Sequence, residues 1–106
     1  MLEKIYPESY IDIEEENVKN FLIELSKMEK NVKEKYGEDF YRPYMIGIHD
    51  IVREILNLPN KVFTIGMNTD ESLVRLIFFP IEPNKKSYDV KRHEETREPY
   101  LLIESE

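Results

Sequence analysis

The sequence contains no cysteine and only three glycines in 106 residues. The lack of cysteine excludes disulfides, thiolate zinc sites and cysteine nucleophiles. Gly37, Gly47 and Gly66 are too far apart to form a glycine-rich phosphate-binding loop. No apolar run approaches the ~18 residues of a membrane-spanning helix. The first residues also lack the basic start and apolar stretch of a secretory signal, so we expect a cytoplasmic protein.

The chain is short and acidic. Its length and its hydrophobic fraction of 41% suit one folded domain, residues 1–106. The net charge is −7, and residues 1–40 hold 11 acidic and six basic residues, a net charge of −5. Lysine and arginine form no clustered stripe, which argues against direct binding to a long nucleic acid. The acidic first third indicates either a partner with a basic surface or an adaptation for solubility, and both interpretations stay open.

Hydrophobic periodicity predicts two amphipathic helices. Residues 14–36 place apolar side chains at helical spacing, and Gly37 is expected to end this helix. A second helix is expected to open at Pro43, because proline suits the first helical turn, and to end at residues 57–60.

Polar residues of the first helix suggest local pairs. Asp12 and Glu15 have the spacing of a capping box at the helix start. Glu29 and Lys33 are one turn apart, so we expect them to pair on the exposed face.

Four short segments are expected to form strands. Residues 61–79 predict a β-hairpin, with a turn at residues 68–71. Residues 9–13 and 100–103 predict a first and a final strand. Residues 80–99 contain prolines and mixed charges without periodicity, which predicts a long loop that is functional or mobile. The fold class is therefore α+β, with two helices packed on a small, mostly antiparallel sheet.

The second strand of this hairpin is apolar on both faces. One face carries Val74, Leu76 and Phe78, and the other carries Leu73, Ile77 and Phe79, interrupted by Arg75. A strand that is apolar on both faces is usually covered on both. Either the chain itself covers both faces, or the second face meets another protein.

Candidate catalytic residues are few. His49 and Arg53 are one helical turn apart, so they could serve as a general base and an anion-binding group. Their face is offset from the apolar stripe, and the plainer interpretation makes His49 a solvated residue of the polar flank. His93 lacks a partner histidine at ligand spacing, so no metal or cofactor is expected. The helix dipole alone explains Glu14, Glu15 and Glu16 at a helix start.

From residue 45 onward the chain resembles the small viral ring nucleases that act as anti-CRISPR proteins against type III systems. The resemblance rests on the order of five segments: Met45-Ile-Gly-Ile-His49, Asn60-Lys61-Val62, Asp70 before an apolar strand, Pro80-Ile-Glu-Pro-Asn-Lys-Lys86 and Tyr100-Leu-Leu-Ile-Glu104. It implies a homodimer that binds cyclic oligoadenylate and cleaves it with a histidine, with His49 and Arg53 lining a shared pocket.

The same segments also depart from the family pattern. Ile48 separates Gly47 from His49, which turns the histidine by about 100° on a helix. Phe79 and Pro80 stand where the family has an arginine. These departures put the residues for cleavage in doubt, so the resemblance implies a protein that either binds or cleaves cyclic oligoadenylate.

The leading hypothesis is therefore a small, non-enzymatic interaction protein. It would be a phage or mobile-element inhibitor or regulator that docks on a basic surface of a larger protein. The expected contact residues are the acidic residues at the helix start and the residues of the second face of the apolar strand: Glu14, Glu15, Glu16, Leu73, Arg75, Ile77 and Phe79. The alternatives are a ring-nuclease-like enzyme acting through His49 and Arg53, and an inactive subunit of a larger complex.

Overall fold

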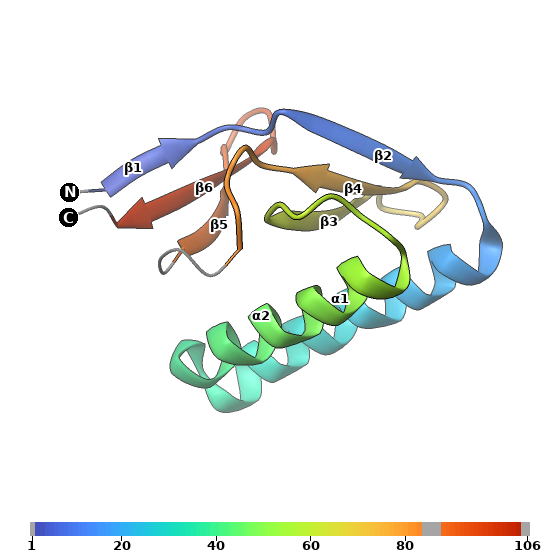
Figure 1. The fold of residues 1–106 in the computed structure, drawn as a ribbon, viewed down its shortest axis with the longest axis horizontal. Coiled ribbons are helices and arrows are strands. Elements are labelled where there is room, and N and C mark those ends of the chain that lie inside the picture. The colour runs from blue at the N-terminus through green and yellow to red at the C-terminus, as the bar shows by residue number, and fades with distance from the viewer. Residues whose placement is uncertain (1, 84–87, 105–106) are drawn as a thin grey trace.

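The computed structural model describes residues 2–83 and 88–104. The fold is α+β, as predicted, with two helices packed against two small antiparallel sheets (Figure 1). The elements in chain order are β1 (Leu2–Ile5), β2 (Ser9–Ile13), α1 (Glu16–Tyr36), α2 (Glu38–Ile55), β3 (Phe63–Met67), β4 (Val74–Phe78), β5 (Tyr88–Arg92) and β6 (Pro99–Glu104). Within the described ranges, neither helix is long and apolar enough to cross a bilayer.

The six strands form two sheets of three strands each. We call the sheet with strand order β2-β4-β3 the central sheet, and the sheet with order β1-β6-β5 the terminal sheet. The predicted hairpin is confirmed, because β3 and β4 pair antiparallel with Phe63 opposite Phe78. The predicted first strand, β2, joins this hairpin on the other side of β4.

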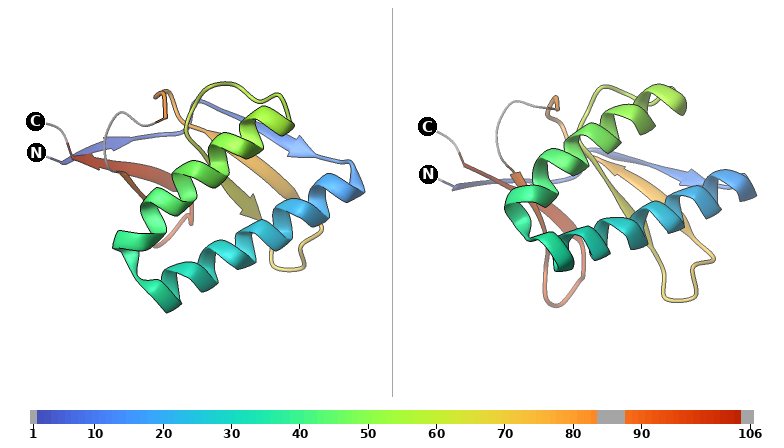
Figure 2. Two further views of the ribbon diagram at one scale, coloured as in Figure 1. Left: turned by 60° about the horizontal axis from the view of Figure 1, so that its bottom comes forward. Right: turned by 90° about the horizontal axis from the view of Figure 1, so that it is seen from below.

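Both helices lie on the same side of the central sheet (Figure 2). The main core lies between these layers. It consists of Leu22, Ile23, Leu25 and Val52 from the helices and Phe63, Ile65, Val74, Leu76 and Phe78 from the sheet. The helical spacing of the first set and the alternation of the second explain why these elements bury these faces.

The apolar residues on the second side of β4 are covered mainly by the chain itself. Phe79 is fully buried in a second cluster with Val62, Leu101 and Ile103, and Ile77 packs against that cluster. Leu73 stays exposed. The chain itself therefore covers Phe79 fully and Ile77 in part, so for these two residues the first interpretation of this strand is correct.

Several predicted boundaries are wrong. The second helix begins at Glu38 rather than Pro43, so only Gly37 separates the two helices. Proline lacks the N–H that would bond to residue 39, but this single missing bond does not stop the helix. The amide of Tyr41 already donates to the Gly37 carbonyl at 3.0 Å, so the first turn forms without help from Pro43.

The expectation of one sheet and a loop over residues 80–99 is also wrong. The final strand pairs with β1 and β5 instead of joining the hairpin. β5 lies inside residues 80–99, a stretch in which mixed charges hide the strand pattern. Residues 84–87 of that expected loop lie outside the described residues.

Candidate functional site

His49 is a buried residue, which corrects its predicted place on a solvated polar flank. Its side chain belongs to α2 but faces α1 and the central sheet, and the residue is only 9% exposed. Its Nε2 atom lies 2.7 Å from Oε1 of Glu29 on α1. Its ring stacks on Phe63 of β3, with 4.3 Å between the ring centroids. His49 therefore connects both helices to the sheet.

Arg53 lies one turn further along α2 and is 6% exposed. Its Nη1 atom donates to the carbonyl oxygen of Lys61 at 3.1 Å, and Nη2 donates to the carboxylate of Asp50. Its guanidinium also lies over the ring of Phe63, 5.5 Å from the centroid. The structure thus brings His49 and Arg53 to one aromatic ring, as their spacing predicted, but turns both inward.

The contacts that His49 and Arg53 make limit the chemistry that these two side chains can carry out. A general base must come within hydrogen-bond distance of the proton that it removes. The Nε2 atom of His49 is already bonded to Glu29, and Phe63 covers the ring face. In the described conformation the cluster acts as a set of polar contacts that fix the helix pair on the sheet.

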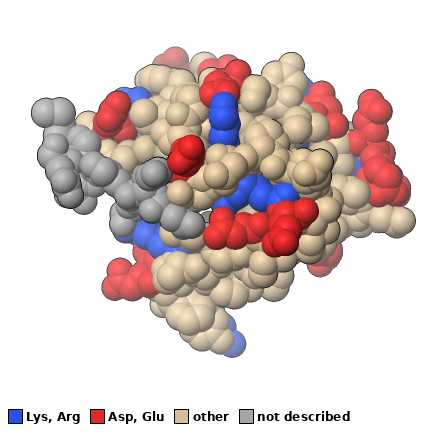
Figure 3. All heavy atoms as spheres, in the orientation of Figure 1, with Lys and Arg blue, Asp and Glu red and all other residues tan. Residues whose placement is uncertain are grey.

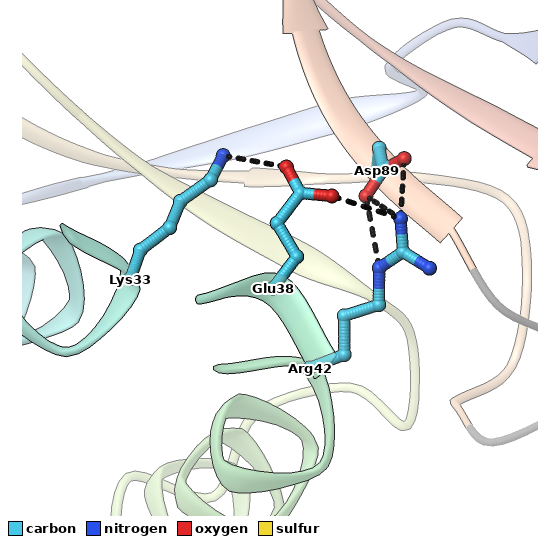
Figure 4. A network of polar contacts seen from close by, with 4 residues as sticks. All are labelled: Lys33, Glu38, Arg42 and Asp89. Carbon is cyan, nitrogen blue, oxygen red and sulfur yellow. Dashed lines mark hydrogen bonds and ion pairs between the residues drawn. The ribbon is translucent and has the colours of Figure 1, made fainter. Parts of the chain in front are cut away.

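Glu29 was expected to pair with Lys33, and this expectation is wrong. Glu29 binds His49 instead, and the ammonium of Lys33 lies 3.5 Å from Glu38. Figure 4 shows that Glu38 also contacts Arg42, at 3.4 Å, and that the guanidinium of Arg42 reaches Asp89 of β5 at 2.8 Å. This network joins the helix pair to the terminal sheet.

Tyr41 lies beside this network on α2. Burial, followed by the nearby carboxylates, raises the pKa of Tyr41 to about 12. The phenol is therefore held in its neutral form over the physiological range of pH.

Acidic side chains gather where β2 passes into α1 (Figure 3). Glu14 and Glu16 are exposed, and Glu15 is the N-cap, because its carboxylate accepts from the Val18 amide at 2.7 Å. This corrects the predicted cap, Asp12. That residue lies in β2 and pairs with Arg75, whose hydrogen bond lowers the pKa of Asp12.

The turn between β3 and β4 lies next to this helix start. The ammonium of Lys19 on α1 donates to the carbonyl oxygen of Ser72 in the turn at 2.9 Å. The turn carries Asp70, whose pKa is lowered by hydrogen bonds from Ser72, and Glu71, which lies 3.7 Å from Lys27 of α1. We call the surface formed by Glu14, Glu15, Glu16, Asp70 and Glu71 the acidic end.

The predicted contact residues in and next to β4 do not share one surface. Leu73 is exposed beside the acidic end. Arg75 lies on the sheet surface, with its guanidinium 3.8 Å from the ring centroid of Tyr10. Ile77 is half-buried, and Phe79 has no exposed surface to offer a partner.

His93, the other histidine, lies in the turn between β5 and β6. Its ring packs 4.7 Å from Tyr100 and 6.1 Å from Tyr6. Over residues 2–83 and 88–104, the structure brings together no group of three or more histidine or acidic side chains suited to a metal ion.

No family model, curated protein or solved structure matches this chain. The ring-nuclease resemblance therefore rests on the quoted residues alone.

Proposed function

We propose that this protein is a small acidic interaction protein that docks on a basic surface of a larger protein and inhibits or regulates it, as phage and mobile-element inhibitors do. The observation that carries this proposal is the acidic end. Its carboxylates come from two segments more than 50 residues apart, which Lys19 and Ser72 hold side by side.

The acidic end has the properties of a charged docking surface. Glu14 and Glu16 face solvent, and Lys27 is paired with Glu24 and Glu71. Exposed Leu73 adds an apolar side chain at its edge. A partner with lysines or arginines around a small apolar pocket would complement this surface. Such charge complementarity speeds association and selects the partner.

The test is capture of a partner from host lysate at low and high salt, followed by titration with that purified partner. Glu14→Gln with Glu16→Gln should weaken binding by roughly 2- to 30-fold, because each exposed ion pair contributes about 0.2–1 kcal/mol. Glu15 stays intact because it caps α1. Added salt should reduce the wild-type affinity, since screening weakens exposed charges.

Glu94→Gln with Glu95→Gln is the matched control. It removes the same charge from the exposed turn between β5 and β6 and should leave binding unchanged. The proposal is wrong if both double variants bind alike, or if no stoichiometric partner is captured at any salt concentration.

A ring-nuclease-like activity is the second candidate. The observation in its favour is the 2.7 Å bond between Nε2 of His49 and Glu29, since a carboxylate on one ring nitrogen can orient an imidazole whose other nitrogen, Nδ1, acts as the base. Purified protein should then cleave cyclic oligoadenylate, and His49→Ala should lower turnover by roughly 10²-fold. Absence of cleavage by the wild-type protein would dismiss this candidate and leave the first one untouched.

A further inference from the structure

Both helices carry large apolar side chains that the rest of the chain leaves exposed. We call these side chains the outer helix face. Its members are between 43% and 67% exposed and comprise Phe21, Met28 and Tyr36 from α1 and Phe40, Ile51 and Ile55 from α2. Exposed apolar surface of this extent is a mark of an interface.

The two helices place these side chains in a definite order. The hydroxyl of Tyr44 donates to the sulfur of Met28 at 3.5 Å, which sets the register of the antiparallel pair. At the closed end, where Gly37 joins the helices, the rings of Tyr36, Phe40 and Tyr44 follow one another, with centroids 5.1 and 6.0 Å apart. The helices diverge toward the other end (Figure 2). There, by the same register, Phe21 and Ile51 are exposed.

Gly47 lies in the middle of this face. It sits inside α2 and is exposed, and a Cβ built at this position would meet nothing within 4 Å. Glycine weakens a helix interior relative to alanine, so a glycine is costly here and serves no packing contact within the chain. Its position, flanked by Phe40 and Ile51, suits a second helix that crosses α2 closely.

We propose that a second copy of this chain packs on the outer helix face, with a two-fold axis at Gly47, to form an antiparallel four-helix bundle. In the helix register, Gly47 lies level with Leu25 of α1. The two-fold axis then places Phe21 of one copy near the partner's Met28. It also lays the aromatic closed end of each copy over the diverging end of the other.

Charge agrees with this arrangement. The exposed side chain of Lys35 lies at the closed end, and that of Glu54 lies at the diverging end. The two-fold axis brings each Lys35 toward the Glu54 of the partner. The antiparallel arrangement therefore brings opposite charges together at both ends of the interface.

The exposed apolar area of the outer helix face is also large enough for a dimer. At about 200 Å² per large side chain, the exposed fractions give roughly 600 Å² of apolar surface per copy. Stable interfaces bury about 800 Å² per partner, including polar surface at the rim. This interface differs from the one that the ring-nuclease resemblance implies, because His49 and Arg53 face the sheet and take no part in it.

Sedimentation velocity over a hundredfold range of concentration tests the proposal. Wild-type protein should reach twice the monomer mass of 12.8 kDa. Ile51→Asp should weaken self-association by at least about tenfold, since it puts a charge into the interface one helical turn from the two-fold axis. Leu2→Asp, a matched change at an exposed residue of the terminal sheet, should have no effect. A monomer at every concentration, or equal effects of the two changes, would overturn the dimer.

Two further measurements test the axis. Gly47→Ala should raise the melting temperature of the dilute monomer while weakening self-association, and an unchanged association would refute close approach at Gly47. Lys35→Glu and Glu54→Lys should each weaken the dimer, whereas the double variant should recover it. Failure of this recovery would overturn the antiparallel register. None of these measurements needs another protein, so their outcome is independent of the proposed docking function.

Discussion

Removal of the Glu29 carboxylate tests whether the contact with His49 holds the helix pair together. In Glu29→Ala, the Nε2 atom of His49 loses the partner that lies 2.7 Å away. Both side chains are well covered, at 11% exposed for His49 and 15% for Glu29. Water therefore has little access to replace the lost bond, and the free energy of unfolding should fall.

The size of this fall follows from the cost of leaving a buried polar atom without a partner. That cost is about 1–3 kcal/mol. For a domain of this size, each kcal/mol lowers the melting temperature by about 4–8 °C, so a cost of about 2 kcal/mol corresponds to ~8–16 °C. Helix propensity contributes little, since glutamate and alanine both favour helices. Glu29→Gln keeps an oxygen or nitrogen near Nε2 of His49. Its free energy of unfolding should therefore fall by less than half as much as that of Glu29→Ala.

Urea unfolding followed by circular dichroism gives the measurement, with Glu34→Ala as the control. Glu34 is an exposed residue of the same helix, so its replacement should change stability by less than about 0.5 kcal/mol. A double-mutant cycle with His49→Phe should show a coupling energy of at least about 0.5 kcal/mol. Equal stabilities of Glu29→Ala and Glu34→Ala would refute the reasoning, because the contact would then add nothing to the fold.

Three other predictions concern the backbone, the second core cluster and pH. Gly37→Ala should lower the free energy of unfolding by on the order of 1–3 kcal/mol, because Gly37 has φ 83° and ψ 171°. Gly47→Ala should not destabilise the fold, and thermal unfolding measures both variants. Phe79→Ala should lower the free energy of unfolding, measured in urea, by about 3–5 kcal/mol, because Phe79 is buried. Leu73→Ala should lower it by less than ~0.5 kcal/mol, because Leu73 is exposed. The folded-state pKa of Tyr41, about 12, lies above its ordinary value of 10.0, so its contribution to stability should be full below pH 10 and disappear as pH rises to about 12. Unfolding measured across this range should show a smaller loss in Tyr41→Phe.

The parts of the fold that the sequence predicted are those governed by local patterns. Helical spacing predicts that Leu22 and Leu25 of α1 are buried, and alternation predicts the same for Val74 and Leu76 of β4; both predictions are confirmed. The same helical spacing also placed Phe21, Met28 and Tyr36 on the buried stripe of α1, and these three are exposed. The end of α1 at Gly37 was equally local. What the pattern did not contain was the division into two sheets, because pairing between distant strands leaves no periodic signal in either segment.

The candidate site shows the same limit at the level of single side chains. His49 and Arg53 were recognisable as neighbours from their spacing, but their burial depends on the angle at which α2 meets the sheet. Glu29 was missed as the partner of His49 because it comes from the other helix, 20 residues away. The only available signal was its place beside the apolar stripe of α1, close to Leu25.

The pairing of β1 with β6 sets the order in which the molecule can be completed. Leu2 lies opposite Glu104, so two segments about a hundred residues apart share one ladder, and the two ends of the described chain lie side by side (Figure 1). During synthesis, β1 emerges early and has no strand beside it until β6 leaves the ribosome. An unpaired strand is open to pairing with other chains. Any segment attached before β1 or after β6 would extend from this same end of the terminal sheet. A bulky segment there would affect the pairing of β1 with β6, which is the last step of folding.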